Sequence, residues 1–406
     1  MKEDFSPSKM EQFDSSMCDV SLENLFDSEE GRKILTCIQC GMCVGTCPHG
    51  YAMQYPPRRI IGLLRAGMIE KVLRNPDLLL CVACYSCMVK CPRKIQLTHL
   101  LLPAVKVKVF ESLPEIPEEL QRALENTFRY GNPMGESPRK RADWVKEVDV
   151  PVRIFSEDPR PADVLWWVEC YSSYHPRGKD ATKATARILN ALEIDFAILG
   201  NEERCAGECA RLEGEVGLFD DLTDKNIKTL KKYKFNKIVS SGAHAYDAFK
   251  YQYPCRGFKF PLEQITPFLA KHLKKLKPLL KKKLDYVVTY HDSCCLGKHN
   301  GFYEEPRALL SAIPGIRLVE MVHNRENSLC CGGGGGGMWL DTYFKVLGLE
   351  RLSERRAKEA IATGADVLAV SCPYEVSRFE DAIKVLGYED KLIVRDVVEL
   401  LDEAMR

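Results

Sequence analysis

The chain has 406 residues, enough for two or three domains that each bury a core of their own. Hydrophobic residues make up 45% of it and charged residues 28%, which is typical of a globular protein and excludes a disordered one. The formal net charge of +1 provides no global field that would attract nucleic acid or an acidic substrate, so we expect no nucleic-acid partner.

Cysteine is the unusual residue, with 18 in the chain. The first residues, MKEDFSPSKMEQFDSSM, lack the basic start and apolar core of a secretory signal, so we expect a reducing compartment in which thiols bind metal. The longest apolar runs, such as VLWWV at 164–168, have the length of buried strands and are too short for a membrane span. The sequence therefore predicts a cytoplasmic protein that reaches the inner face of a membrane only through a partner subunit.

Two cysteine motifs of identical spacing lie in the first predicted domain, residues 1–110. In a C-x2-C-x2-C-x3-C-P run, three thiolates on one tight loop ligate a four-iron cluster, and the fourth cysteine ligates the neighbouring cluster. The motif CIQCGMCVGTCP contributes Cys37, Cys40, Cys43 and Cys47, and the motif CVACYSCMVKCP contributes Cys81, Cys84, Cys87 and Cys91. We predict one [4Fe-4S] cluster on Cys37, Cys40, Cys43 and Cys91, and a second on Cys81, Cys84, Cys87 and Cys47.

Zinc is the alternative metal for these motifs. Zinc sites use two separated C-x2-C pairs and no third cysteine at the same step, so we favour iron–sulfur clusters. Between the motifs, PPRRIIGLLRAGMIEKVLRNPDLLL carries apolar residues at helical spacing. The region resembles the helical type of two-cluster ferredoxin, a module that transfers single electrons.

The rest of the chain changes in composition twice. Residues 111–162 are rich in proline and charge, which is typical of a long connector over the surface. From 163 onward, strand-like runs alternate with helical patterns, which predicts α/β units with mainly parallel sheets. We expect two such units, at 163–270 and 285–406, joined by the strongly basic segment KHLKKLKPLLKKKL.

The two α/β units are interpreted as repeats of each other. Cys170 pairs with Cys294, Gly207 with Gly332, Ser241 with Ser371 and Phe249 with Phe379, at offsets of 124, 125, 130 and 130. Such steady offsets over four landmarks indicate a duplication.

The second repeat holds five cysteines in three motifs. These are HDSCCLG with Cys294 and Cys295, LCCGG with Cys330 and Cys331, and SCPYE with Cys372. Each motif follows a predicted strand, and the carboxyl ends of parallel strands meet at one edge of a sheet, so we expect the five thiols to converge. The six glycines at 332–337 are expected to leave room for a bulky inorganic core or substrate.

These motifs carry a resemblance to a known family. One Cys, then Cys-Cys-Gly about thirty-five residues on, then Cys-Pro-x-Cys is the signature of the CCG domain. A two-cluster ferredoxin followed by two CCG domains resembles the catalytic iron–sulfur D subunit of heterodisulfide reductase. The arrangement is similar also to the K subunit of the sulfite-reduction-linked membrane complex and to the iron–sulfur subunit of glycolate oxidase. The resemblance implies an electron-transfer subunit of anaerobic energy metabolism with a third iron–sulfur centre in a CCG domain. In heterodisulfide reductases that centre is a non-cubane cluster that cleaves a disulfide.

Both repeats depart from the family motif. The first keeps Cys170 and Cys205, with Cys209 nearby, but has Ala206, Gly242 and Ala245 at the other ligand positions, so we expect a degenerate repeat without a cluster. His244 is interpreted as a satisfied core histidine, with a ligand or proton donor as the alternative. The second repeat keeps Cys294, Cys330, Cys331 and Cys372, while Glu375 occupies the last cysteine's place. Whether Glu375 or Cys295 is a further ligand is left open, and so is whether the third centre is a cubane or a non-cubane cluster.

The predicted function is that of an iron–sulfur oxidoreductase subunit. Electrons would pass through the two ferredoxin clusters to or from the third centre, for redox chemistry on a disulfide or a disulfide-bearing carrier protein. His291, Lys298 and His299 are candidate proton donors. The alternative function is a pure electron conduit between a flavoprotein or hydrogenase subunit and a membrane cytochrome of the b type; a zinc-stabilised scaffold is a third possibility. No phosphate-binding loop or dinucleotide fingerprint is present, so neither flavin nor nucleotide is expected.

Overall fold

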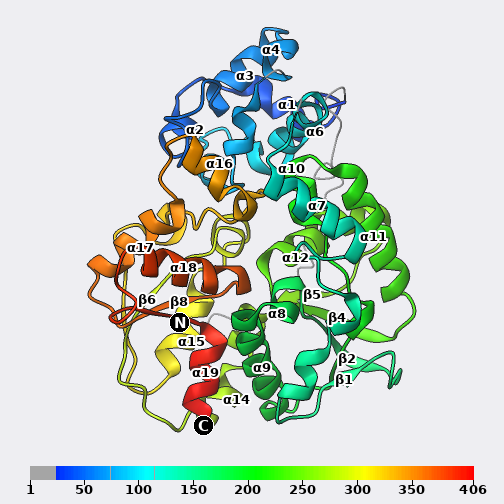
Figure 1. The fold of residues 1–406 in the computed structure, drawn as a ribbon, viewed down its shortest axis with the longest axis vertical. Helices are drawn as coiled ribbons and strands as arrows, with labels where there is room; N and C mark the ends of the chain where they lie inside the picture. Colours follow the sequence, from blue (N-terminus) through cyan, green and yellow to red (C-terminus); the bar gives the residue numbers. More distant parts are fainter. Residues whose placement is uncertain (1–23, 74, 114) are drawn as a thin grey trace, which may run out of the picture.

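The computed structural model describes residues 24–73, 75–113 and 115–406. In Figure 1 the N-terminal helical region, in blue and cyan, lies above two α/β units that stand beside each other, one in green and one in yellow to red. The predicted order, a helical region followed by two parallel α/β units, is confirmed.

The helical region is built from short helices around the two cysteine motifs. They are α1 (Glu29–Arg32), α2 (Met42–Gly45), α3 (Pro57–Arg65), α4 (Ile69–Leu73), α5 (Ser86–Val89) and α6 (Leu102–Ser112), with a π-helical turn at Leu97–Leu101 before α6. The two motifs have the same local form, because each places its third cysteine in the first turn of a one-turn helix, α2 or α5. The residue before each of these helices, Gly41 or Tyr85, has a left-handed backbone that turns the chain sharply into the helix.

The segment predicted as a surface connector, 111–162, also contributes to the interior. It forms helix α7 (Glu118–Tyr130), whose buried face includes Leu120 and Ala123. Further along, Trp144 is fully buried in the core of the α/β units and Arg141 is 2% exposed. The proline-rich composition predicted a connector, and it did not reveal these buried side chains.

The first α/β unit has a five-stranded, all-parallel sheet in the order β1-β3-β2-β4-β5. The strands are β1 (Arg153–Ile154), β2 (Ala162–Trp167), β3 (Phe196–Ile198), β4 (Phe235–Ser240) and β5 (Leu262–Gln264). The helices are α8 (Cys170–Tyr174), α9 (Pro176–Ala191), α10 (Glu208–Glu213), α11 (Val216–Leu230), α12 (Ala243–Asp247), α13 (Ile265–Lys271) and α14 (Leu273–Leu276).

The second unit has a four-stranded, all-parallel sheet in the order β7-β6-β8-β9. The strands are β6 (Val287–Tyr290), β7 (Arg317–Val319), β8 (Val367–Val370) and β9 (Ile393–Asp396). The helices are α15 (Glu304–Ala312), α16 (Asp341–Val346), α17 (Leu352–Ala362), α18 (Pro373–Val385) and α19 (Val397–Met405). Without β1, the first sheet has the same strand order, which supports a duplication.

Equivalent residues make equivalent contacts in the two units. The indole of Trp166 donates to Ser241 Oγ over 2.8 Å, and the hydroxyl of Tyr290 donates to Ser371 Oγ over 3.2 Å. Each serine directly follows a central strand of its sheet, and the two aromatic residues lie 124 positions apart in the sequence. The duplication inferred from four landmarks therefore extends to the side-chain contacts at the ends of the strands.

The two units pack on each other through pairs of helices, with one helix of each pair from each unit. Helix α9 of the first unit packs against α19 of the second, and α15 of the second packs against α13 of the first. One apolar core runs through both units and includes Trp166 and Tyr290. Because α13 and α19 follow equivalent strands, this pairing gives the units an approximate two-fold relation and turns the carboxyl ends of both sheets toward one shared region.

Candidate metal centre

The eight cysteines of the helical region lie in two groups, and each group takes its fourth member from the other motif. Burial and the neighbouring thiolates Cys37, Cys91 and Cys40 raise the pKa of Cys43 to about 11. Burial and the charges of Cys84 and Cys81 raise the pKa of Cys47. Thiols that raise each other's pKa need a cation before all of them ionise, which is what a metal cluster supplies. The residues thus fit two clusters with exchanged fourth ligands.

The second of these groups surrounds a small apolar cavity. Cys47, Cys81, Cys84 and Cys87 all line it, together with apolar side chains such as Met53 and Leu102. A dry shell of this kind limits solvent access, which is one of the properties that set the potential of a bound cluster.

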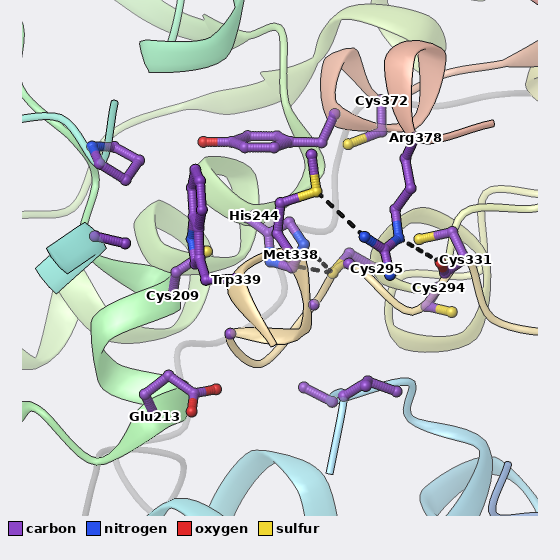
Figure 2. Close-up of a pocket in the computed structure, with 18 of the residues that line it drawn as sticks. Cys209, Glu213, His244, Cys294, Cys295, Cys331, Met338, Trp339, Cys372 and Arg378 are labelled. Carbon is purple, nitrogen blue, oxygen red and sulfur yellow. Dashed lines mark hydrogen bonds between the residues drawn. The ribbon is translucent and has the colours of Figure 1, made fainter. Parts of the chain in front are cut away.

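The five thiols of the second repeat converge on a larger cavity, as the strand-end argument predicted. Cys294 and Cys295 follow β6, Cys372 follows β8, and Cys330 and Cys331 lie on the loop between β7 and α16. All five line the cavity, and Figure 2 shows Cys294, Cys295, Cys331 and Cys372. Cys295 begins a π-helical turn, Cys295–His299, a local distortion that is common at functional sites. Interaction with the sulfurs of Cys294 and Cys331 raises the pKa of the Cys330 thiol.

The glycine run lines the cavity with Gly333, Gly334 and Gly336, and it has a second role that was not predicted. A Cβ atom at Gly334 would lie 2.8 Å from the carbonyl oxygen of Val82, and one at Gly335 would lie 2.7 Å from that of Cys81. Both positions therefore need glycine because the loop presses against the backbone of the second ferredoxin motif. The glycines therefore also bring the two cysteine sites together.

This contact also joins sulfur atoms of the two sites. Cys84 of the second ferredoxin motif and Cys330 of the second repeat pack in one buried cluster, and each thiol shifts the pKa of the other. Beside them, the Lys298 ammonium donates to Ser86 Oγ over 2.8 Å and to the Ser328 carbonyl over 2.6 Å, and Lys298 is only 8% exposed. A buried positive charge thus lies among thiols that would carry negative charge once they bind metal.

His291, Cys331 and Glu375 form a second possible ligand set within the same site. Their ligand atoms lie within 4.8 Å of one another. The Arg356 guanidinium donates to His291 Nδ1 over 3.1 Å, so the ring proton lies on Nε2, which faces Glu375 Oε1 at 3.3 Å. His291 Nε2 and Glu375 Oε2 are buried without a hydrogen-bond partner. Such orphaned atoms beside thiols fit a site that binds metal.

Comparison with known proteins gives two family matches. The model of the CCG family, a cysteine-rich domain, matches residues 164–244 and 288–374. The model of a 4Fe-4S dicluster domain matches residues 36–96.

The D subunit of the dihydromethanophenazine:CoB–CoM heterodisulfide reductase of Methanosarcina barkeri is 30% identical over 401 residues, which are 91% of this chain and 93% of that protein. The chain belongs to this CCG-domain iron–sulfur family. Two bacterial relatives are the probable iron–sulfur-binding oxidoreductase FadF of Bacillus subtilis and the EtfAB:quinone oxidoreductase of Syntrophomonas wolfei. They are 32% and 33% identical over 84% of this chain, which spans about half the length of each.

The dicluster match implies two [4Fe-4S] clusters in the helical region. Two of the relatives are named as oxidoreductases. The relatives include subunits of redox complexes, among them heterodisulfide reductase. Within the described ranges of the chain, no helix has the length and apolar character needed to cross a bilayer.

The equivalent site of the first CCG domain is occupied by side chains of the protein itself. Gly242 stands where the second domain has Cys372, and a Cβ at Gly242 would lie 2.0 Å from the Glu169 carboxylate, which therefore fills the place of the missing thiol. The Ala245 N–H donates to the same carboxylate over 3.2 Å. The Arg141 guanidinium lies 3.2 Å from the Cys170 sulfur. A carboxylate and a guanidinium take up space that ligands and metal use in the second domain.

The three predicted proton donors are in different surroundings. His291 lies at the site, as described, and Lys298 lies between the ferredoxin motif and the CCG thiols. His299 is turned away from the cavity, because its Nδ1 pairs with Asp247 at 2.8 Å and its ring stacks on Tyr85. The π-helical turn that carries Cys295 sends this side chain to the far side, an effect that sequence proximity could not reveal.

Sequence reasoning missed several residues of the site. His244, interpreted as a core histidine, lines the cavity with its ring 3.8 Å from the Cys295 sulfur (Figure 2). Trp339 and Met338 form part of the wall, and Arg378 donates to the Cys331 carbonyl over 2.7 Å. Arg378 follows Glu375 by three positions on α18, so helical spacing was a usable signal for it. His244 lies in α12 and Trp339 in the short helical turn Gly337–Trp339, and the approach of these two elements depends on domain packing.

Proposed function

We propose that this oxidoreductase passes electrons between its two ferredoxin clusters and a third iron–sulfur centre in the second CCG domain, where a disulfide is reduced or formed. The observation that carries the proposal is the contact of Cys84 with Cys330. A ligand of the second ferredoxin cluster and a ligand of the third centre would then touch through sulfur, which is a short path for single electrons.

The donor set of the second domain supports a cluster there. Cys294, Cys330, Cys331 and Cys372 supply four thiols, enough for a four-iron cluster. The orphaned atoms of His291 and Glu375 would supply further ligands or a proton at the same place. When bound, the cluster would supply one-electron chemistry and a site at which sulfur binds iron.

The residues around the thiols support a substrate. The cavity extends from the CCG thiols past Trp339 to Leu120 and Leu124 of α7, so a molecule with an apolar part has a wall to pack against. His244 is within reach of Cys295 and could give a proton to a leaving thiolate. A pure electron conduit does not require a cavity beside its last cluster. It is the second candidate function because Glu375 occupies the position of the last cysteine of the CCG motif.

Iron and acid-labile sulfide counting on anaerobically purified protein tests the third centre. About twelve irons per chain support three four-iron clusters, whereas about eight would leave the CCG domain empty and would overturn the proposal. Electron paramagnetic resonance of the oxidised protein with an added thiol then separates the two functions. A new paramagnetic signal supports substrate binding, and an unchanged spectrum in a twelve-iron protein supports the conduit.

The proposed partners are other redox subunits. A flavoprotein or a hydrogenase subunit would supply or accept electrons at the ferredoxin end, and a membrane cytochrome of the b type would hold the complex at the inner face of a membrane. The names of two relatives, EtfAB:quinone oxidoreductase and the D subunit of heterodisulfide reductase, support partners of this class. Purification of the complex from its host with identification of the bound subunits tests this assignment.

A further inference from the structure

The cysteines of the first CCG domain have surroundings that suit thiol chemistry better than metal binding. The Arg141 guanidinium donates to the Cys170 sulfur over 3.2 Å and to Glu203 Oε1 over 2.9 Å, and Arg141 is 2% exposed. A fixed cation therefore already lies against the sulfur that would be the first ligand.

Cys170 and Cys205 line the same small cavity, and their thiols differ in proton affinity. Burial raises the pKa of Cys170, but the hydrogen bond from Cys205 and the charge of Arg141 outweigh it and bring that pKa to about 7. The hydrogen bond to Cys170, together with burial, raises the pKa of Cys205. One proton shared by two adjacent sulfurs is an arrangement in which either sulfur can become the attacking thiolate.

The pair is connected to the main cavity through one of its members. Cys170, Cys205 and Cys209 line a small cavity next to His244 and Tyr374. Cys205 and Cys209 also line the large cavity that holds Cys295 and Cys331. A small molecule in the large cavity therefore meets Cys205 first, and Cys170 lies behind it.

We propose that Cys170 and Cys205 are a redox-active pair that converts between dithiol and disulfide by exchange with a small disulfide in the shared cavity. The proposal concerns the domain that lacks the full ligand set, and it does not depend on a third cluster in the other domain.

The exchange has two balanced steps. Cys205 first passes its proton to the Cys170 thiolate and attacks one sulfur of the disulfide RS–SR′, which forms Cys205–S–S–R and releases R′S⁻. Cys170 then attacks the Cys205 sulfur, and its proton leaves with RS⁻ as RSH. The protein gains the Cys170–Cys205 disulfide and loses two electrons, and the small disulfide gains both. Arg141 stays paired with Glu203 throughout and stabilises whichever sulfur is ionised nearest to it.

The test uses glutathione disulfide as the oxidant on the anaerobically purified full chain with its clusters. The protein is equilibrated over a range of glutathione to glutathione disulfide ratios, acid-quenched, alkylated and digested without reduction. We expect a linked peptide containing Cys170 and Cys205 that appears at high disulfide and disappears at high thiol. Cys209→Ser is the matched control, because Cys209 lines the same two cavities. It should leave the link intact.

Further variants keep the result decisive. Cys170→Ser should abolish the link and leave a mixed disulfide of Cys205 with glutathione. Arg141→Met should slow formation of the link at pH 7 by about tenfold, because a thiol pKa that is higher by about one unit lowers the thiolate fraction by that factor. Arg141→Lys should recover part of the rate.

An unlinked pair at every ratio in the parent protein would overturn the proposal. So would a link that survives Cys205→Ser, or one equivalent of zinc or iron that is lost in Cys170→Ser.

Discussion

The ammonium of Lys298 donates a 2.8 Å hydrogen bond to the hydroxyl of Ser86, which lies between Cys84 and Cys87 of the second ferredoxin motif. Lys298 belongs to the second CCG domain, more than two hundred positions away. Burial opposes its positive charge, but the charges of Cys294, Cys84 and Cys330 outweigh burial and raise its pKa. One buried positive charge is thus shared by the two sites between which electrons are proposed to pass.

Replacement of this charge should change the cluster potentials. A unit charge about 6 Å away, at an effective dielectric constant near 20, contributes roughly 3 kcal/mol. For one electron this corresponds to on the order of 100 mV. We expect Lys298→Met to lower the midpoint potential of the second ferredoxin cluster by about that amount, because the reduced, more negative state loses its cation. Potentiometric titration followed by electron paramagnetic resonance measures the shift.

Lys358→Met is the matched control for this measurement, since Lys358 is exposed on α17 and pairs with Glu350. Its potentials should equal those of the parent protein. Equal potentials in Lys358→Met and Lys298→Met, at full iron content in both, would show that Lys298 has no electrostatic influence on the clusters.

The close approach of the glycine loop to the ferredoxin motif should be sensitive to a single methyl group. Gly335→Ala places a Cβ 2.7 Å from the Cys81 carbonyl at φ +51°, whereas Gly348→Ala has a similar φ of +69° and nothing within 4 Å. Both variants bear the strain of a left-handed alanine, and only Gly335→Ala adds the clash, which we expect to cost about 1–3 kcal/mol more. The apparent unfolding temperature of the cluster-loaded protein should fall further in Gly335→Ala. Equal decreases would show that the loop can move away from the motif.

Cys331 and Cys209 line the same cavity from opposite domains, which allows a direct comparison of the two repeats. We expect Cys331→Ser to reduce the iron content from about twelve to about eight per chain, through loss of the third centre. Cys209→Ser should retain about twelve. Iron and sulfide analysis measures both, and the spectra of the two ferredoxin clusters serve as the internal standard. Loss of iron in Cys209→Ser would indicate metal in the first repeat.

Glu169 should make stability depend on pH. Burial, with the charges of Cys170 and Glu203, raises its pKa from 4.5 to about 8. The folded protein therefore holds a proton that the unfolded chain releases above pH about 4.5, so this contribution to stability is complete at low pH and is lost as pH rises through 8. Glu169→Gln keeps the neutral form at every pH. We expect the parent protein to lose several degrees of apparent unfolding temperature, relative to this variant, between pH 5 and pH 8. Parallel pH profiles would contradict the assigned shift.

The amino-acid sequence alone was enough to predict the metal chemistry of the helical region and the order of the domains. Ligand spacing is a local property, since three thiols on one short loop can meet three irons whatever surrounds them, as at Cys37, Cys40 and Cys43. The duplication was also visible, because equivalent strand ends retained landmarks such as Ser241 and Ser371. The convergence of the CCG thiols followed from the rule that parallel strands end at one edge of a sheet.

The tertiary structure decided what lies between the sites. The contact of Cys84 with Cys330, the position of Lys298 against Ser86 and the approach of His244 to Cys295 all join residues from different domains, and no periodicity or spacing specifies how domains pack. The same holds for Glu169 and Arg141, which fill the degenerate site from positions outside the motif. Local sequence determines which residues can bind iron. Only long-range packing determines which thiols are paired with a cation, which lie next to another site, and which are left to react with each other.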